Sequence, residues 1–294
     1  MTSIQSGVKV QRLDRRAIQP HLPQLDAWLL PDAFYGVQQT WPQLYRSDGS
    51  GRFYAVFEDD RLVSHCAARV VLAHGQSGVF RCALLGSVAT APDRRGSGLA
   101  SAVLTAALAD LAADADQVLL WAERPCLYER HGFAATEPET MLMLARRPHP
   151  DLHGVREAVP ADHAALQRLH TQKPWRIERT QHDMSGLLTT PGLHTLVRER
   201  NGRIVAYACC GKGADLHDTW HEVGGDDAEV ARLLQAGLHV LGQTHAAVLQ
   251  PPYRTRLATL LGASLVELVP IPGPMANSYR GEPPVLFVDG LDSV

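Results

Sequence analysis

Residues 89–104, ATAPDRRGSGLASAVL, place two arginines and two glycines between an apolar stretch and a helical pattern. The preceding ALLGSVA has the character of a short strand, and apolar residues recur at helical spacing from Leu99 onward. Asp93–Gly98 would therefore lie at a helix N-terminus, where free N–H groups and a partial positive charge favour an anion. Glycines let a ligand approach the backbone, and Arg94 and Arg95 add permanent positive charge. The stretch predicts a phosphate or pyrophosphate site.

Two other phosphate-binding motifs fit this stretch poorly. The pattern Gly-x-x-x-x-Gly-Lys-Ser/Thr is absent from the chain. Gly96–Ser101 ends in serine where the dinucleotide fingerprint needs glycine or alanine, and it lies far from an N-terminal βαβ unit. A plain alternative stays open, in which the glycines only turn the chain and water surrounds the arginines.

Two motifs in the first half resemble those of one enzyme family. Arg95–Ala100 is similar to Gln/Arg-x-x-Gly-x-Gly/Ala, the acetyl-CoA pyrophosphate loop of GNAT-type (GCN5-related) N-acetyltransferases. Leu127–Phe133, LYERHGF, resembles the second hallmark of that family, a Tyr-Glu-Arg-x-Gly-Phe helix end. The motifs occur in order, with a predicted helix and strand between them. The tight resemblance covers residues 83–144, and a looser one covers residues 1–148.

The resemblance implies a fold class and an activity. The fold is α/β, with a central mixed β-sheet flanked by helices and acetyl-CoA bound where two parallel strands splay. The activity is that of an N-acetyltransferase, which transfers acetyl from acetyl-CoA to a primary amine of a small molecule or peptide by direct attack on the thioester. One alternative is a non-catalytic acetyl-CoA- or acyl-CoA-binding sensor or interaction module of the same fold. Another is an acyltransferase that uses a different acyl donor.

The resemblance also assigns roles to individual residues. Main-chain groups of Val88 and Thr90 would hold the pantetheine arm of acetyl-CoA. Tyr128 would stand near the cofactor sulfur, where its phenol could protonate the departing thiolate; packing on the core is its alternative role. The pyrophosphate would lie against Arg94, Arg95, Gly96, Ser97, Gly98, Leu99 and Ala100.

The general base is less well defined, because the strand glutamate of many relatives is missing. The corresponding residues 86–89 read GSVA, and none of them is a base. Glu123 follows the next predicted strand and is the first candidate for accepting the proton of the amine. His65, His131, a chain of water molecules and direct loss of the proton to solvent are the alternatives.

The second half of the chain repeats the pattern of the first. Hairpin turns are predicted at Asp59–Asp60 and at Asn201–Gly202, each after a helical region, residues 10–29 and 155–170. Each hairpin is followed by a longer helix, a short apolar strand and a short helix that ends at glycine. The sequence therefore predicts two tandem GNAT-like domains.

We place the domain boundary in the proline-rich stretch near residues 145–154. Residues 1–148 would form the GNAT domain with the acetyl-CoA site, and residues 153–294 a degenerate GNAT-like domain without cofactor. In the second copy, Asp226 and Asp227 stand at the predicted helix N-terminus, where carboxylates would repel a phosphate, and Ala258 replaces the tyrosine. The final stretch IPGPMANSYRGEPP is too proline-rich for a regular central strand.

The composition describes a globular chain without signs of a nucleic-acid or membrane partner. Of 294 residues, 45% are hydrophobic and 20% charged, and the net charge is −3 at neutral pH. No basic surplus attracts anionic polymers, no apolar run approaches a membrane span, and the N-terminus does not resemble a signal peptide. No pair among the five cysteines has metal-ligand spacing. We expect a cytoplasmic monomer or homodimer that binds no metal, nucleic acid or membrane.

Overall fold

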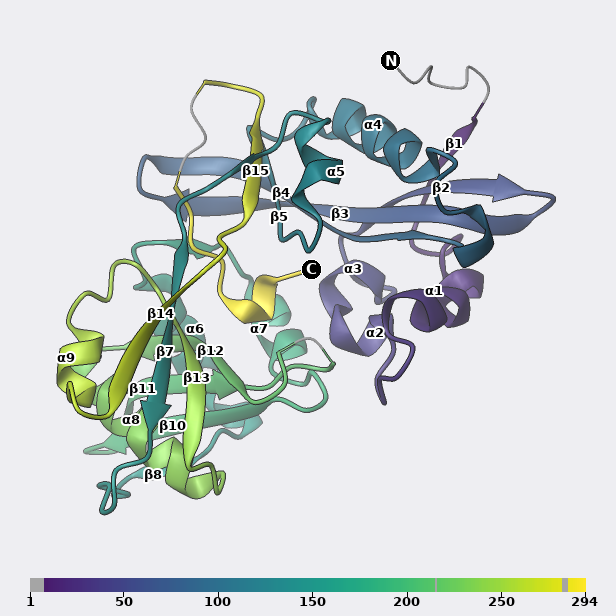
Figure 1. The fold of residues 1–294 in the computed structure, drawn as a ribbon. Helices are drawn as coiled ribbons and strands as arrows, with labels where there is room; N and C mark the ends of the chain where they lie inside the picture. The colour runs from purple at the N-terminus through teal and green to yellow at the C-terminus, as the bar shows by residue number, and fades with distance from the viewer. Residues whose placement is uncertain (1–7, 215, 282–284) are drawn as a thin grey trace.

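The computed structural model describes residues 8–214, 216–281 and 285–294 as two β-sheets with helices packed against them (Figure 1). This confirms the predicted α/β class and the two-sheet arrangement. The first seven residues of the predicted first domain, and residues 282–284 of the proline-rich stretch, lie outside the described residues.

The first sheet has the order β1-β2-β3-β4-β5-β15-β6, and β9 pairs with β3. Among its described pairs, only β4 and β5 run parallel. The strands are β1 (Val10–Leu13), β2 (Arg52–Glu58), β3 (Arg61–Gly75), β4 (Gly78–Thr90), β5 (Gln117–Leu120), β6 (Ala134–Ala135), β9 (Arg176–Ile177) and β15 (Met275–Ser278).

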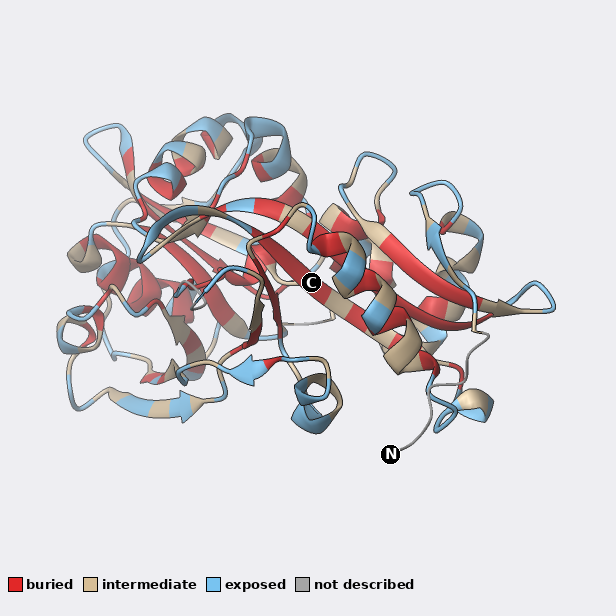
Figure 2. Ribbon diagram, turned by 90° about the horizontal axis from the view of Figure 1, so that it is seen from above, coloured by how far each residue is buried: buried red, intermediate tan, exposed pale blue. Residues whose placement is uncertain are grey.

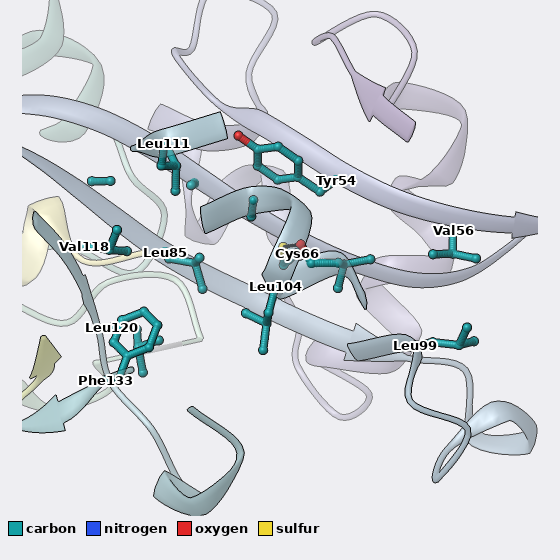
Figure 3. Close-up of a cluster of buried hydrophobic side chains, with 14 of the residues drawn as sticks. Tyr54, Val56, Cys66, Leu85, Leu99, Leu104, Leu111, Val118, Leu120 and Phe133 are labelled. Atoms are coloured by element: carbon teal, nitrogen blue, oxygen red, sulfur yellow. Dashed lines mark hydrogen bonds between the residues drawn. The ribbon is translucent and has the colours of Figure 1, made fainter. Parts of the chain in front are cut away.

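Helices cover both faces of the first sheet. On one face α4 (Leu99–Leu111) packs its apolar side chains onto β2–β5, and Figure 3 shows this cluster around Cys66, Leu85 and Leu104. The opposite face carries a separate core built by the short N-terminal helices. These helices are η1 (Gln19–His21), α1 (Leu22–Leu29), α2 (Val37–Thr40) and α3 (Pro42–Tyr45), while η2 (Pro92–Arg94) precedes α4 and α5 (Pro125–Glu129) follows β5.

The second sheet repeats this design with the order β8-β10-β11-β12-β13-β7-β14. Here β12 and β13 are the parallel pair. The strands are β7 (Glu139–Ala145), β8 (Val155–Glu157), β10 (His194–Arg200), β11 (Arg203–Cys210), β12 (Thr219–Gly225), β13 (His245–Gln250) and β14 (Val266–Ile271). The helices are η3 (Pro160–Asp162), α6 (His163–Thr171), α7 (Gln181–Leu187), α8 (Asp227–Val240), α9 (Leu257–Leu261) and η4 (Gly290–Asp292).

The two halves exchange strands between the sheets, and the short β9 of the second half also pairs with β3 of the first sheet. The strand beside β5 is β15 from the end of the chain, and the strand beside β13 is β7 from the first half (Figure 1). Sheet membership therefore does not follow a division at residues 148 and 153, because β7 precedes that division and β15 follows it. Each half contributes backbone hydrogen bonds to the sheet of the other.

Several local predictions can be compared with the structure. Both hairpin turns are confirmed, and Asp59, Asp60, Asn201 and Gly202 all have positive φ. The helical regions predicted at 10–29 and 155–170 each begin with a short strand before the helix starts. The prediction for IPGPMANSYRGEPP was wrong, because its proline-free residues Met275–Ser278 form an internal strand between β5 and β6.

Burial follows the sheets (Figure 2). The central strands of both sheets and the sheet-facing sides of the helices are buried, while the edge strands, the outer helix faces and most turns are half-buried or exposed. Cys209 and Cys210 are buried as expected for small apolar side chains, and the described cysteines are all free thiols. None of the described helices is both long and apolar enough to cross a membrane.

Candidate active site

The N-terminus of α4 is built from glycines in backbone conformations that other residues rarely adopt. Gly96 has φ of +79°, and Gly98, the N-cap, has φ of +82°. A Cβ atom added at either glycine would meet nothing within 4 Å. No described side chain caps the helix, so the first N–H groups of α4 remain available to a ligand. The geometry fits an anion such as a diphosphate.

The two arginines of the loop differ in their surroundings. Arg94 is half-buried and forms an ion pair with Glu58, so much of its charge is already balanced. Arg95 is exposed, and its Nε lies 3.4 Å from the carbonyl oxygen of Thr90. Ser97 Oγ donates to the carbonyl oxygen of Arg94 at 2.5 Å, which closes the turn. The positive potential here comes mainly from the helix amides and Arg95.

Strands β4 and β5 part along the end of β4 that leads into this loop. Their described pairing runs from Cys82 opposite Gln117 to Leu84 opposite Leu119 and then stops, although β4 continues to Thr90. The parted segment contains Val88 and Thr90, both half-buried. An unpaired strand edge offers backbone N–H and C=O groups to an extended ligand. Val88, Thr90 and the loop therefore lie on one continuous stretch of chain that leads into α4.

A β-bulge lies in the parted segment of β4. His65 is opposite Ala89 and Ala67 is opposite Gly86, so Ser87 and Val88 together face a single residue of β3. Ser87 has φ of +53°. The side chain of His65 reaches across, and its Nδ1 lies 3.0 Å from the carbonyl oxygen of Ser87. The sequence contains no sign of this bulge, because it arises from strand register.

Tyr128 lies on α5, which follows β5. Its ring packs edge-on against Phe133 at 6.1 Å between centroids and contacts the core on the α4 face. Burial raises the pKa of its hydroxyl, and Cys66 and Glu123 add to the shift. The phenol therefore keeps its proton at neutral pH. A general acid that protonates a departing thiolate must hold such a proton.

The remaining candidate bases lie in different surroundings. Glu123 is exposed on the short loop between β5 and α5. His131 is hydrogen-bonded through Nε2 to Ser101 Oγ at 2.8 Å, and its carbonyl oxygen accepts from Asn277 Nδ2 at 2.7 Å. His131 therefore ties the end of α5 to α4 and β15. His65 lies fully buried on the opposite face of the sheet.

The face of β4 opposite α4 is bordered by the end of the chain and by α3. A Cβ atom at Gly86 would lie 2.5 Å from the backbone oxygen of Val294. Gln43 of α3 donates through Nε2 to the carbonyl oxygen of Leu291 at 2.6 Å. Sequence analysis missed this contribution of residues 286–294, because nothing in their composition indicates where they pack.

The corresponding place in the second sheet is filled by the protein's own side chains. Asp226 caps α8 by accepting from the N–H of Ala228 at 2.9 Å, and Asp227 pairs with Arg254 at 2.6 Å. These carboxylates occupy the helix N-terminus as the sequence predicted.

A buried ion network lies where β12 and β13 part. Glu222 accepts two hydrogen bonds of 2.8 Å from Arg179, and Lys173 Nζ lies 3.2 Å from Glu222 and 2.8 Å from Asp289. Among the described residues, His170, Glu222 and Asp289 have spacing that could hold a metal ion. Lys173 and Arg179 already supply positive charge to this cluster, so it gives no evidence for a metal site.

Comparisons with known proteins agree with this geometry. Residues 20–136 match the family model described as an acetyltransferase (GNAT) domain. No curated protein matches the chain in sequence.

Solved structures match nearly the whole chain at low identity. An Enterococcus faecalis protein described as a probable N-acyltransferase superposes with a TM-score of 0.73 and 15% identity over 94% of this chain and 73% of that one. A GCN5-related N-acetyltransferase from Anabaena variabilis gives 0.67 and 14% over 92% and 73%. Eis1 from Mycobacterium abscessus gives 0.63 and 14% over 92% and 74%. At these identities the likeness establishes the fold. Residues 20–136 thus match the model of the GNAT acetyltransferase family, and the whole chain has the fold of the GCN5-related N-acetyltransferases on which it superposes.

Proposed function

We propose that this protein is an N-acetyltransferase that moves the acetyl group of acetyl-CoA to a primary amine of a small molecule or peptide. One observation carries the proposal: an uncapped, glycine-lined helix N-terminus follows the segment of β4 that has parted from β5. That arrangement suits a ligand with an extended arm and a diphosphate. The family match supports acetyl transfer as the reaction class.

The binding roles follow from which groups are open. The amides from Gly96 to Ala100 would hold the diphosphate, with Arg95 adding charge from solvent. The edge of β4 at Val88 and Thr90 would hydrogen-bond the pantetheine arm. Arg94 would contribute less, because Glu58 already neutralises it. The arm then ends between β4 and β5, near the bulge and Tyr128.

The chemical roles follow from which groups can accept a proton and which can donate one. The amine must lose a proton before it attacks the thioester carbon, and Glu123 is an exposed carboxylate beside the site that can accept one. The tetrahedral intermediate carries negative charge on the thioester oxygen, which backbone N–H groups of the bulge can stabilise. As the carbon–sulfur bond breaks, the Tyr128 hydroxyl gives its proton to the thiolate. Its raised pKa keeps that proton in place through neutral pH.

The test combines binding and turnover. Acetyl-CoA at 100 times its Kd should stabilise the protein by about 2.7 kcal/mol, measured as a shift in thermal unfolding. The wild type should then release free thiol when given a panel of polyamines, aminoglycosides and peptides. Binding without thiol release on any amine would favour the sensor alternative, and no binding at all would remove the proposal.

Tyr128→Phe should lower kcat by about 10²–10⁴ with little change in the Kd for acetyl-CoA, since only the transferable proton is lost. Tyr279→Phe is the matched control, because the Tyr279 hydroxyl donates to the carbonyl oxygen of Leu108 on α4 at 2.8 Å and should be silent in turnover. Equal kcat values for wild type and Tyr128→Phe, with chemistry rate-limiting, would exclude Tyr128 as the acid.

A further inference from the structure

The bulge in β4 depends on a residue outside both sequence motifs. We propose that His65 is a positioning residue for acetyl transfer, which holds the backbone of Ser87 so that the bulge amides meet the thioester oxygen. This inference rests on the proposed function. In this role His65 holds a backbone group in place. It does not act as the general base, which was one of the alternatives from the sequence.

The hydrogen bond fixes the state of the histidine ring. A carbonyl oxygen can only accept, so the proton must lie on Nδ1, which lies 3.0 Å from the oxygen of Ser87. Burial lowers the pKa of His65 to about 4, and the bond to Ser87 offsets only part of that effect. The ring is therefore neutral across the physiological range. Its centroid lies 6.2 Å from that of Tyr45 and 6.0 Å from that of Phe53, and its Nε2 has no partner among the described residues.

Ser87 needs to be held. Its φ of +53° is unfavourable for any residue with a Cβ atom, and such conformations persist only where surrounding contacts impose them. Its own hydroxyl is buried against the Tyr45 side chain and makes no hydrogen bond of ordinary geometry among the described residues. The side chain that hydrogen-bonds to the Ser87 backbone is that of His65.

The held segment lies where position matters most. Pairing between β4 and β5 stops at Leu84, and the bulge begins three residues further on. Ser87 and Val88 are therefore on the parted edge that faces the cofactor arm. Hydrogen-bond donors to a developing oxyanion act only when they are placed before the reaction, and a displacement of about 1 Å can cost about 100-fold in rate. The contact from His65 fixes that placement from the far face of the sheet.

Paired substitutions separate this role from packing. His65→Leu keeps an apolar bulk but removes the donor, whereas the amide nitrogen of His65→Asn can occupy the place of Nδ1. We expect His65→Leu to lower kcat by about tenfold or more, with the Kd for acetyl-CoA within about twofold of wild type. His65→Asn should keep at least about a third of wild-type kcat, because it restores the hydrogen bond. If His65→Leu does not unfold cooperatively, His65→Ala takes its place.

A double-mutant cycle with Ser87→Gly gives the sharper readout. Glycine adopts positive φ readily, so the hydrogen bond from His65 contributes less to holding residue 87 in its conformation. In the Ser87→Gly background, His65→Leu should lower kcat by less than about threefold. Equal losses in both backgrounds would indicate packing and overturn the proposal, as would a wild-type kcat for His65→Leu. An absence of thiol release by the wild type would overturn the proposed function and this inference together.

Discussion

The N-termini of α4 and α8 occupy equivalent positions in two sheets of the same strand order, yet they differ in what meets their amides. At α4 the N-cap is Gly98, and no described side chain caps the helix. At α8 the N-cap is Asp226, whose carboxylate already accepts from Ala228. A single residue type thus decides whether a helix N-terminus is satisfied internally or left for an anion.

The strands before these helices repeat the contrast. Beyond the last pair of β4 and β5, the chain offers Gly86 and the Ser87 bulge, with no charged side chain on either residue. Beyond the last pair of β12 and β13, Glu222 is fully buried and bound by Arg179 and Lys173. The same fold therefore supports an open site in one sheet and a closed ion network in the other.

The first prediction concerns the first half of the chain produced without the second half. Residues 1–150 alone lack β15, so β5 and β6 lose the strand between them, and β7 loses both of its partners. We expect this fragment to show no cooperative unfolding and no acetyl-CoA binding, as measured by circular dichroism and calorimetry.

Co-expression provides the control for the fragment. Residues 1–150 and 151–294 produced together should associate and recover cofactor binding, because each fragment supplies strands to the sheet of the other. A first fragment that folds and binds acetyl-CoA alone would show that the exchange is dispensable and that the second half does not support the first.

The second prediction concerns the closed site. Burial alone would raise the pKa of Glu222, but the charges of Arg179 and Lys173 together lower it well below its ordinary value. Glu222→Gln removes the one carboxylate that both cations share, leaving Lys173 only Asp289 and Arg179 only Asp292 as ion-pair partners among the described residues. The free energy of unfolding should therefore fall by about 3 kcal/mol in urea titrations at neutral pH. Glu157→Gln, which touches only the exposed pair with His194, is the control and should have little effect.

The pH dependence of this effect has a definite sign. Because the pKa of Glu222 is lowered on folding, its charge contributes stability above its unfolded pKa, and the contribution is lost as the pH falls through the folded value. The difference between wild type and Glu222→Gln should therefore shrink in acid. A difference that stays constant down to acid unfolding would mean that the charge of Glu222 is not the source of stability.

The sequence was informative wherever function depends on local chemistry. Gly96 and Gly98 signalled a backbone open to a ligand, Asn201–Gly202 signalled a hairpin, and Asp226 signalled a carboxylate at a helix N-terminus. These features are properties of a few adjacent residues. Their physical cause, backbone freedom or a side-chain acceptor beside an N–H, can be recognised from residue type alone.

The features that sequence analysis missed depend on distant pairing. The bulge at Ser87 exists only in the register of β3 against β4, and its contact with His65 spans 22 residues. The strand Met275–Ser278 takes its place beside β5 through backbone hydrogen bonds that carry no residue signature. The prolines of the stretch argued against a central strand, but they lie in the flanking residues and not in the strand itself.

The last prediction exchanges the character of the two helix N-termini. Gly98→Asp would give α4 the acidic N-cap of α8, in open space where a side chain meets nothing. Its carboxylate would satisfy the amides and repel a diphosphate, so acetyl-CoA affinity should fall by about 100-fold in calorimetry. Gly98→Asn has the same shape and a similar tolerance of positive φ without the charge, and should lose far less. In the other sheet, Asp226→Ala should cost about 1 kcal/mol of stability and leave affinity unchanged. If Gly98→Asp and Gly98→Asn weaken binding equally, backbone geometry and not charge separates the open site from the closed one.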